Sequence, residues 1–364
     1  MAAVPMNRVA GWLGWFAVCR GGLVAVVAAA GLLGSAQAQG WQPTQPVELV
    51  VPAGTGGGAD QMARLIQKLV ADHRLMPQPV QVSNKAGNSG VEGLLYMKAA
   101  QGDPHKLVIT LSNLFTAPLA AGADVGWRDL TPVQLLAQDQ FVLWVHAQAP
   151  QRNAAEMLAA LRSAPPGSLK LGGTGSRQED QLISVLLETA AATRIAYVPL
   201  KGGGDVAKAL AAREVDLTVN NPIEAEALWR QGVLRPLCVF DGKPLAQRVP
   251  VAGTQSWADL PTCMSAGMPV QYLMMRGIFA APGLTPAQRA YYDGVLDRLR
   301  ALPEWQAFMA RGAFSATVMK GAEFEAWLDR TERFHRVLMR EARFKAPAVP
   351  VAAPAMPTAS APKK

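Results

Sequence analysis

Apolar residues recur along the chain with two alternating periods, one typical of strands and one typical of helices. Val47–Val51 is a short apolar and β-branched run, and Gln61–Val70 follows it with apolar side chains at helical spacing. The same alternation continues as far as residue 220. Further predicted strands lie at 79–84, 105–111, 141–147, 168–173, 194–200 and 215–220, and further predicted helices at 91–100, 154–164, 179–190 and 204–213. This alternation predicts an α/β fold with largely parallel sheets, in which ligand-binding loops follow the carboxyl ends of the strands.

The two ends of the chain are predicted to lie outside this fold. Residues 1–38 combine arginines with the apolar run Gly21–Gly34 and with small residues at Ala36 and Ala38, which is typical of a signal peptide cleaved after Ala38. An uncleaved anchor is the less favoured alternative, because the run is shorter than the roughly 20 residues that a membrane span needs. Residues 345–364 are rich in Pro and Ala without apolar periodicity, which indicates a disordered tail. The mature chain is therefore expected in the periplasm.

Composition and charge narrow the class of protein only a little. Half of the 364 residues are hydrophobic and 17% are charged, which is typical of a globular chain long enough for two domains. The formal charge of +8 stays positive after the predicted cleavage and mildly favours acidic small ligands. Cys238 and Cys263 remain in the mature chain, and in an oxidising compartment they either form a disulfide or stay as buried thiols. No histidine lies near either cysteine in the sequence, so neither is expected to be catalytic.

The loops after the predicted strands are rich in glycine and short polar residues. The first strand runs directly into Gly54, Gly56, Gly57 and Gly58, just before the first predicted helix. Glycine permits close backbone approach, and a helix N-terminus offers unpaired N–H groups with partial positive charge, so this loop suits an anion. Similar loops follow later strands, at 84–90, 112–117, 174–177 and 201–205. We expect several of these loops to converge on one ligand.

The motifs of an enzyme are missing or incomplete. Gly54, Gly56 and Ala59 formally match a dinucleotide-binding fingerprint, but the second strand ends at Asn84, where that fold needs an acidic residue for the ribose. The sequence has no phosphate-loop or G-x-S-x-G motif, and its four histidines are scattered without metal-binding spacing. Ser89 lies between glycines without a nearby base and is interpreted as part of a turn that opens a helix. We therefore expect no catalysis, no cofactor and no metal.

Six stretches, in this order and spacing, carry a family resemblance. They are QPVELVVPAGTGGGADQMARLI, VQVSNKAGNSGVEG, GDPHKL, LKLGGTGSRQEDQLISVLL, AYVPLKGGGDVAKALAAREVDLTVNNP and RGIFAAPGLTPAQR. From about Trp41 to Phe344 the chain resembles the periplasmic substrate-binding proteins of tripartite tricarboxylate transporters, often called Bug proteins. The resemblance implies a class II periplasmic-binding-protein fold, which is α/β with two domains and a ligand cleft between them. It places 41–142 and 275–344 in domain I and 143–274 in domain II, with the chain crossing between them near Phe141–Ala147 and Met275–Pro282.

The resemblance also implies where the solute is held. In the family, backbone N–H groups of the glycine loop hold one carboxylate, often through waters, and a loop of the other domain holds much of the rest. Carried over to this chain, the implied ligand-binding residues are Gly57, Gly58, Ala59, Asp60, Ser112, Asn113, Thr174, Gly175, Ser176, Arg177, Lys201 and Asn221.

Three of these side chains leave alternatives open. Arg177 stands where the family often has a small polar residue, and it either pairs with a second carboxylate through its planar guanidinium or faces solvent. Lys201 either contacts the ligand or holds a loop near the hinge. Asn221 either offers its amide to the cleft or caps a turn.

The resemblance implies a binding protein rather than an enzyme. The chain is expected to act as a monomer that captures a di- or tricarboxylate, or an aromatic dicarboxylate, and delivers it to membrane permease subunits. No nucleic acid is expected as a partner. A secreted sensor that presents a carboxylate to a membrane receptor or sensor kinase is the alternative, and the sequence does not separate the two.

Overall fold

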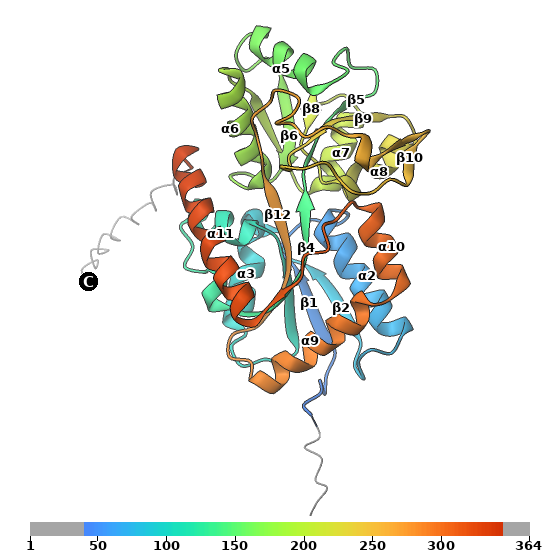
Figure 1. Cartoon of the computed structure of the whole chain (residues 1–364). Helices are drawn as coiled ribbons and strands as arrows, with labels where there is room; N and C mark the ends of the chain where they lie inside the picture. The colour runs from blue at the N-terminus through green and yellow to red at the C-terminus, as the bar shows by residue number, and fades with distance from the viewer. Residues whose placement is uncertain (1–39, 345–364) are drawn as a thin grey trace, which may run out of the picture. The chain divides into compact units, whose positions relative to one another are not determined.

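The structure is a computed structural model that describes residues 40–344 (Figure 1). The predicted signal peptide and the predicted C-terminal tail lie outside the described residues. From Gln42 onward the described chain belongs to one unit by its internal contacts. Within residues 40–344, no helix is long and apolar enough to cross a membrane.

A six-stranded sheet forms the core of one half of the fold, which we call lobe 1. In spatial order its strands are β13 (Met319–Lys320), β4 (Thr131–Gln140), β12 (Leu273–Ala280), β3 (Lys106–Thr110), β1 (Val47–Val51) and β2 (Val80–Asn84). The helices of this lobe are α2 (Gly58–Asp72), α3 (Val91–Ala99), α4 (Asn113–Ala121), α9 (Pro286–Arg300), α10 (Pro303–Arg311) and α11 (Gly321–Glu341). Their apolar faces pack on the sheet, as at Met62 and Ile66 of α2, which are buried.

A five-stranded sheet forms the core of the other half, which we call lobe 2. In spatial order its strands are β7 (Ala196–Leu200), β6 (Lys170–Thr174), β8 (Leu217–Thr218), β5 (Val142–His146) and β9 (Leu234–Val239). The helices of this lobe are α5 (Ala154–Ser163), α6 (Glu179–Ala191), α7 (Gly203–Ala211) and α8 (Pro222–Arg230). A short hairpin, β10 (Pro250–Ala252) and β11 (Gln255–Ser256), completes the lobe. Three tryptophan rings, Trp144, Trp229 and Trp257, pack against one another in its core.

Both sheets are mixed, so the expectation of largely parallel sheets is wrong. β1 pairs in parallel with β2 and β3, and β6 pairs in parallel with β7 and β8. The pairings of β12 with β3 and β4, of β13 with β4, and of β5 with β8 and β9 are antiparallel. Two of these five antiparallel pairings involve β4, which the prediction missed and whose buried residues include Gln134, Asp139 and Gln140. A strand with polar residues inside the protein shows no apolar period in its sequence.

The chain passes between the lobes at two neighbouring points. β4 ends at Gln140 in the first sheet and β5 begins at Val142 in the second, so only Phe141 separates them. On the return, the Tyr272 N–H donates to the Phe240 carbonyl of lobe 2 (2.8 Å), and β12 begins with the next residue. Figure 1 shows β4 and β12 side by side where the lobes meet. The first crossing therefore lies at the start of the predicted segment Phe141–Ala147, and the second lies just before the predicted segment Met275–Pro282. The domain boundaries themselves remain a prediction.

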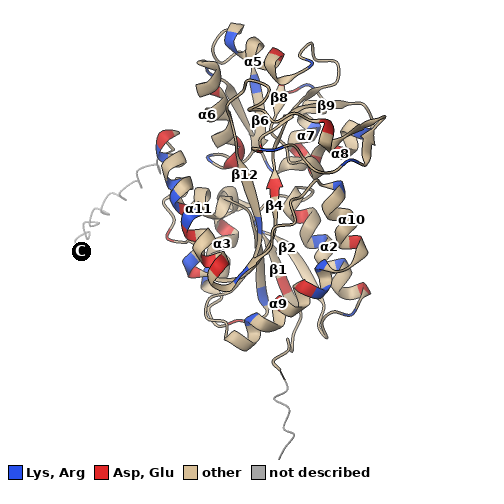
Figure 2. Cartoon of the chain, viewed as in Figure 1, with Lys and Arg blue, Asp and Glu red and all other residues tan. Residues whose placement is uncertain are grey.

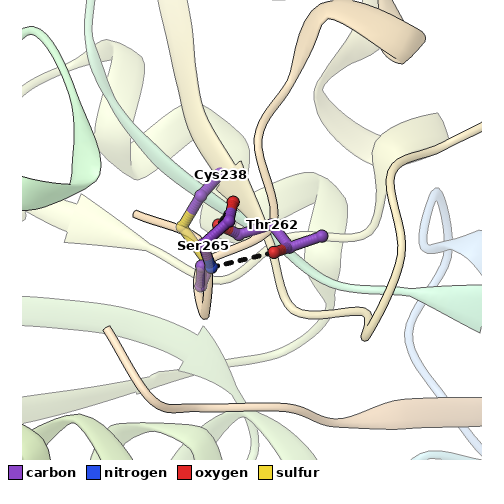
Figure 3. The surroundings of a disulfide bond; sticks show 4 residues. Cys238, Thr262 and Ser265 are labelled. Carbon is purple, nitrogen blue, oxygen red and sulfur yellow. Dashed lines mark hydrogen bonds between the residues drawn. A yellow bond between two sulfur atoms is a disulfide. The ribbon is translucent and has the colours of Figure 1, made fainter. Parts of the chain in front are cut away.

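Cys238 and Cys263 form a disulfide, which answers the question that the sequence left open (Figure 3). The bond joins the end of β9 to the segment 262–268, where the Cys263 N–H also donates to the Val239 carbonyl (2.9 Å). Beside it, the Ser265 N–H donates to Thr262 Oγ1 (3.0 Å) and holds the turn together.

Removal of this disulfide is expected to lower the free energy of unfolding by about 3 kcal/mol, because the bond closes a loop of 25 residues and restricts the unfolded chain. The measurement is urea unfolding of the wild type with and without a thiol reductant. The variant Cys238→Ser with Cys263→Ser is the control and should not respond to the reductant. A wild-type midpoint that the reductant leaves unchanged would argue against the bond.

Candidate functional site

A cavity of about 460 Å³ lies between the lobes, where loops from both sheets meet. From lobe 1 it is lined by loops that follow β1, β2 and β3, and from lobe 2 by loops that follow β6, β7 and β8. Its wall comprises Pro52, Ala53, Gly54, Thr55, Gly57, Gly58, Ala59, Ala86, Ser89, Leu111, Asn113, Phe141, Thr174, Gly175, Gln178, Glu179, Asp180, Leu200, Lys201, Gly202, Gly203, Asp205, Asn221, Glu224 and Met274. The strand-end loops therefore converge, as the sequence predicts.

Most of the predicted ligand-binding residues line this cavity. They are Gly57, Gly58, Ala59, Asn113, Thr174, Gly175, Lys201 and Asn221. Asp60 and Ser112 lie behind the wall instead: both are buried, and the Ser112 hydroxyl accepts from the Met275 N–H (3.3 Å). Ser176 and Arg177 line a separate, smaller cavity beside α4.

Asp60 shapes the glycine loop from behind. Its carboxylate accepts hydrogen bonds from the Gly56 N–H (2.8 Å), from Asn84 Nδ2 (3.0 Å) and from Arg64 Nε (3.0 Å). Burial raises the pKa of Asp60, but these hydrogen bonds outweigh it and hold the pKa below its ordinary value. Asp60 is therefore a charged support for the loop rather than part of the cavity wall.

Arg177 lies outside the lining of the main cavity. Its guanidinium is half-buried and donates through Nη1 to the Ala120 carbonyl near the end of α4 (3.0 Å). Close by, the Ser89 hydroxyl donates to the Ser176 carbonyl (3.3 Å). The loop after β6 is thus tied to lobe 1, and Arg177 belongs to this connection outside the main cavity.

The N-termini of two helices from different lobes face each other in the main cavity. α2 begins at Gly58 after the β1 loop, and α7 begins at Gly203 after the β7 loop. A Cβ atom at Gly57 would lie only 3.6 Å from the Gly203 nitrogen, so the two helix starts are close. Among the described residues, the Gly57 and Ala59 N–H groups have no hydrogen-bond acceptor. The partial positive charges of two helices therefore meet at one place, which suits an anionic group.

Gly54 allows the two loops to come this close. A Cβ atom at this position would lie 2.7 Å from the Lys201 carbonyl oxygen, which is too short for any side chain. The β1 loop and the β7 loop therefore touch backbone to backbone. Lys201 itself is exposed at the rim of the cavity, so its side chain is available to a solute or to solvent.

A carboxylate of the protein already lies between the two helix starts. Glu224 Oε1 accepts from the Gly58 N–H (2.9 Å), and Glu224 Oε2 accepts from the Asn221 N–H (3.1 Å) and from Asn220 Nδ2 (3.1 Å). A Cβ atom at Gly203 would overlap this carboxyl group, so only glycine fits there. The site between α2 and α7 thus accommodates a carboxylate group. Sequence reasoning missed Glu224, although Asn221 followed by Glu224 is the pattern of a helix capping box.

Asn221 lies both at the start of α8 and in the cavity wall. It is the N-terminal cap residue of α8. Its side chain is also fixed from both ends, because Nδ2 donates to the Gln140 carbonyl (2.7 Å) and Oδ1 accepts from Arg276 Nη2 (3.2 Å). These two hydrogen bonds hold the Asn221 side chain at the junction of the lobes.

Arg276 and Asp139 form an ion pair directly beneath the cavity. Both side chains are fully buried, and Arg276 donates to Asp139 Oδ2 through Nε (2.9 Å) and through Nη2. A Cβ atom at Gly58 would lie 2.5 Å from Arg276 Nη2, so the guanidinium packs against the first residue of α2. The pair joins β4 and β12 to the start of α2. Sequence reasoning missed it because β4 was not recognised.

Two buried acidic residues, Glu179 and Asp180, line the cavity from the first turn of α6. Asp180 Oδ2 accepts from the Thr174 N–H (2.8 Å), whereas Glu179 Oε1 has no hydrogen-bond partner among the described residues. Burial raises the pKa of Glu179 to about 7, although the Asn113 N–H opposes this shift. Burial also raises the pKa of Asp180 well above its ordinary value. No functional signal in the sequence marks these two residues, because acids in a first helical turn are common.

Replacement of Glu179 by glutamine tests the cost of burying this carboxyl. Since its pKa is about 7 in the folded chain against an ordinary 4.5, the folded state holds a proton that the unfolded chain releases between these pH values. This proton stabilises the folded state to its full extent below about pH 4.5, and the stabilisation is lost as the pH rises through about 7. At a pH of about 8 we expect Glu179→Gln to be more stable than the wild type by about 2–3 kcal/mol.

The measurement is urea unfolding of both proteins at a pH of about 4.5 and of about 8, with equal stabilities expected at the lower value. Glu323→Gln is the matched control, because Glu323 is also an acid in a first helical turn but is exposed. A Glu179→Gln protein that is less stable than the wild type at the higher pH would contradict the prediction.

Among the described residues, no group of three or more His, Cys, Asp or Glu side chains is arranged to hold a metal ion. The cavity brings together backbone donors, amides and carboxyls from two lobes. Such an arrangement binds and orients a small polar solute.

Sequence comparisons identify relatives of this chain. The model of a family described as "Tripartite tricarboxylate transporter family receptor" matches residues 62–325. A protein of Pseudomonas sp. (strain P51), encoded in the tcbD-tcbE intergenic region, is 30% identical over 272 residues, which are 71% of this chain and 73% of that protein. Protein BugT of Bordetella pertussis is 28% identical over 221 residues, which are 59% of this chain and 66% of BugT. The resemblance inferred from the sequence is therefore confirmed.

Structure comparisons agree on the fold. The periplasmic binding protein BugD superposes with a TM-score of 0.74 at 20% identity, covering 83% of this chain and 99% of BugD. A Rhodopseudomonas palustris protein solved with adipate gives a TM-score of 0.73 at 22% identity, covering 83% of this chain and 98% of that chain. The malate-bound MatC of the same species gives 0.69 at 21% identity, with 82% and 98% covered. The expected two-lobed α/β binding-protein fold is confirmed.

Proposed function

We propose that this chain, which belongs to the tripartite tricarboxylate transporter receptor family, captures an organic carboxylate in the periplasm and delivers it to membrane permease subunits. One observation supports the capture of a carboxylate. The starts of α2 and α7 meet in one cavity, and the carboxylate of Glu224 already occupies part of the space between them. The unpaired N–H groups of Gly57 and Ala59 are left for a carboxylate of the solute.

The binding step follows from this geometry. Backbone N–H groups at a helix start are oriented before a ligand arrives, so little reorganisation is needed when an anion binds. A solute that contacts both lobes favours the conformation in which the lobes are together, because a ligand shifts an equilibrium only by its difference in affinity for the two states. Gly58 and Glu224 already join the lobes through a hydrogen bond of 2.9 Å. A bound solute would add to this connection.

The ligands of two relatives support the choice of a carboxylate. Structural neighbours of this fold have been solved with malate and with adipate, which are both dicarboxylates. The cavity of about 460 Å³ is large enough for a solute of this size. Delivery to permease subunits is supported by the family description.

A thermal-shift screen tests the binding proposal. A ligand present at about a hundredfold excess over its Kd stabilises the folded state by roughly 2.7 kcal/mol, which raises the melting temperature by about 5–10 °C for a chain of this size. We expect such a shift with at least one of succinate, malate, adipate, citrate and phthalate, and no shift with the diamide of the same acid. No shift with any carboxylate would contradict the proposal.

An uptake experiment tests delivery separately. Cells that lack this protein should lose uptake of the labelled carboxylate found in the screen, and the restored gene should return it. A protein that binds the carboxylate while uptake stays intact in its absence would be a sensor instead.

A further inference from the structure

A single residue lies between the main cavity and its smaller neighbour, which we call the outer cavity. The outer cavity has a volume of about 360 Å³ and lies beside α4, where Ala117, Ala120 and Ala121 form part of its wall. Of the described residues, Ser89 alone lines both cavities. A displacement of Ser89 would therefore join the main cavity to the outer one.

Ser89 belongs to lobe 1 but is held by lobe 2. Its hydroxyl donates to the Ser176 carbonyl (3.3 Å) and accepts from the Ser176 N–H (3.4 Å). Its carbonyl accepts from Gln178 Nε2. We call these hydrogen bonds of Ser89 to Ser176 and Gln178 the serine contact. The residue between the two partners, Arg177, donates to the Ala120 carbonyl of lobe 1 (3.0 Å), so three consecutive residues of lobe 2 bind lobe 1 here.

The serine contact is the weaker of two contacts that join the lobes beside the main cavity. Figure 2 shows both signs of charge along outer helices such as α2 and α11, whereas the serine contact joins neutral groups only. Ser176 is exposed, so water can replace its hydrogen bonds. At the other contact, the Gly58 N–H donates to the carboxylate of Glu224 at a shorter 2.9 Å, and hydrogen bonds to a charged group are stronger. The serine contact is therefore the first to separate in a local opening.

Backbone strain gathers on both sides of the serine contact. Asn88 (φ 50°), Ser89 (φ 59°) and Arg177 (φ 59°) are left-handed without being glycine. The other left-handed non-glycine residues of the described chain all lie within two residues after the end of an α-helix, where this conformation is an ordinary helix stop. Strained residues that lack such a local reason are typical of segments that switch between conformations.

We propose that the serine contact is the gate of the main cavity, through which a solute enters and leaves by way of the outer cavity. Separation of Ser89 from Ser176 and Gln178 opens the gate, while Gly58 and Glu224 still join the lobes on the other side. This inference goes beyond the proposed function, because it concerns access to the cavity and holds for any solute that binds there.

Thiol labelling tests the gate on the full mature chain. Met274→Cys places a thiol in the main cavity, because Met274 lines this cavity and is only 3% exposed. Cys238 and Cys263 are joined to each other, so they do not compete for the reagent. The probe is iodoacetamide, which is small and neutral, and mass spectrometry gives the labelling rate. No solute is present, so the result does not depend on carboxylate binding.

Two substitutions in the Met274→Cys chain should change the labelling rate in opposite directions. Ser89→Ala removes the hydroxyl, and we expect labelling about 5- to 100-fold faster, as for the loss of two ordinary hydrogen bonds. Ala121→Phe places a ring in the outer cavity from a partly exposed position, and we expect labelling several-fold slower because the ring fills the route. A variant that was merely less stable would label faster, so the slower rate separates a blocked route from a loss of stability.

Ser163→Ala is the matched control. Ser163 is exposed at the end of α5, and its hydroxyl donates within its own turn to the Ala160 carbonyl (3.3 Å), so the labelling rate should not change. If Ser89→Ala labels no faster than this control, or if Ala121→Phe labels as fast as its parent, the cavity opens elsewhere and the inference is wrong, while carboxylate binding stands. Either substitution tests the gate by itself if the other variant does not fold.

Discussion

Replacement of Arg276 by leucine is expected to lower the free energy of unfolding by about 3–5 kcal/mol, the range for breaking a buried ion pair from one side. Asp139 would be left fully buried without its partner. Asn221 Oδ1 would also lose the donor at 3.2 Å that holds it between the lobes. The measurement is urea unfolding of the variant and the wild type.

A double variant shows whether charge is the cause. Arg276→Leu combined with Asp139→Asn removes both charges, so we expect it to recover a large part of the loss. A single Arg276→Leu variant that loses less than about 1 kcal/mol would contradict a structural ion pair, because such a value is typical of exposed pairs.

Replacement of Gly57 by valine is expected to weaken carboxylate binding by about 100- to 10,000-fold. Gly57 has an ordinary extended backbone (φ −72°, ψ 167°), so a β-branched residue fits the backbone without strain. Its Cβ atom would lie 3.6 Å from the Gly203 nitrogen and 3.6 Å from Glu224 Oε1, and the added methyl groups would fill the space between the two helix starts. Two hydrogen bonds to a charged group, each of about 1.5–3 kcal/mol, would be lost.

The binding loss must occur in a folded protein. Gly126→Val is the matched control, because Gly126 is also extended (φ −152°) and its Cβ atom would meet nothing within 4 Å. Valine at Gly58 is a less specific test, since its Cβ atom would lie 2.5 Å from Arg276 Nη2 and would disturb the buried ion pair. Unchanged affinity in a folded Gly57→Val protein would remove the glycine loop from the site.

The sequence predicts the elements that follow simple rules. Strands such as β1 and helices such as α3 and α6 were expected within one or two residues of their observed ends, because their apolar residues keep a regular period. The glycine loop before α2 was recognised because few other functions need so many glycines at a helix start. These features are local, so a short window of sequence contains the information.

The features that the sequence did not reveal depend on distant contacts. β4 carries buried polar residues, of which Asp139 is matched by Arg276 from a segment 137 residues later. Glu224 is an ordinary capping residue in its own helix, and its contact with Gly58 crosses 166 residues. Glu179 acquires its raised pKa only when folding buries it. Such roles are set by the packing of the two lobes and leave no local pattern.

The most direct test of the central claim is to observe the backbone N–H groups themselves during binding. The claim is that the Gly57 and Ala59 N–H groups, which have no acceptor among the described residues, donate to a carboxylate of the solute. The measurement is a ¹H–¹⁵N NMR titration of the ¹⁵N-labelled mature chain with the carboxylate that raises the melting temperature most. We predict large downfield shifts of the Gly57 and Ala59 amide protons that saturate with binding, while the exposed turn at Gly253 does not move. Saturating binding that leaves both resonances in place would contradict the account.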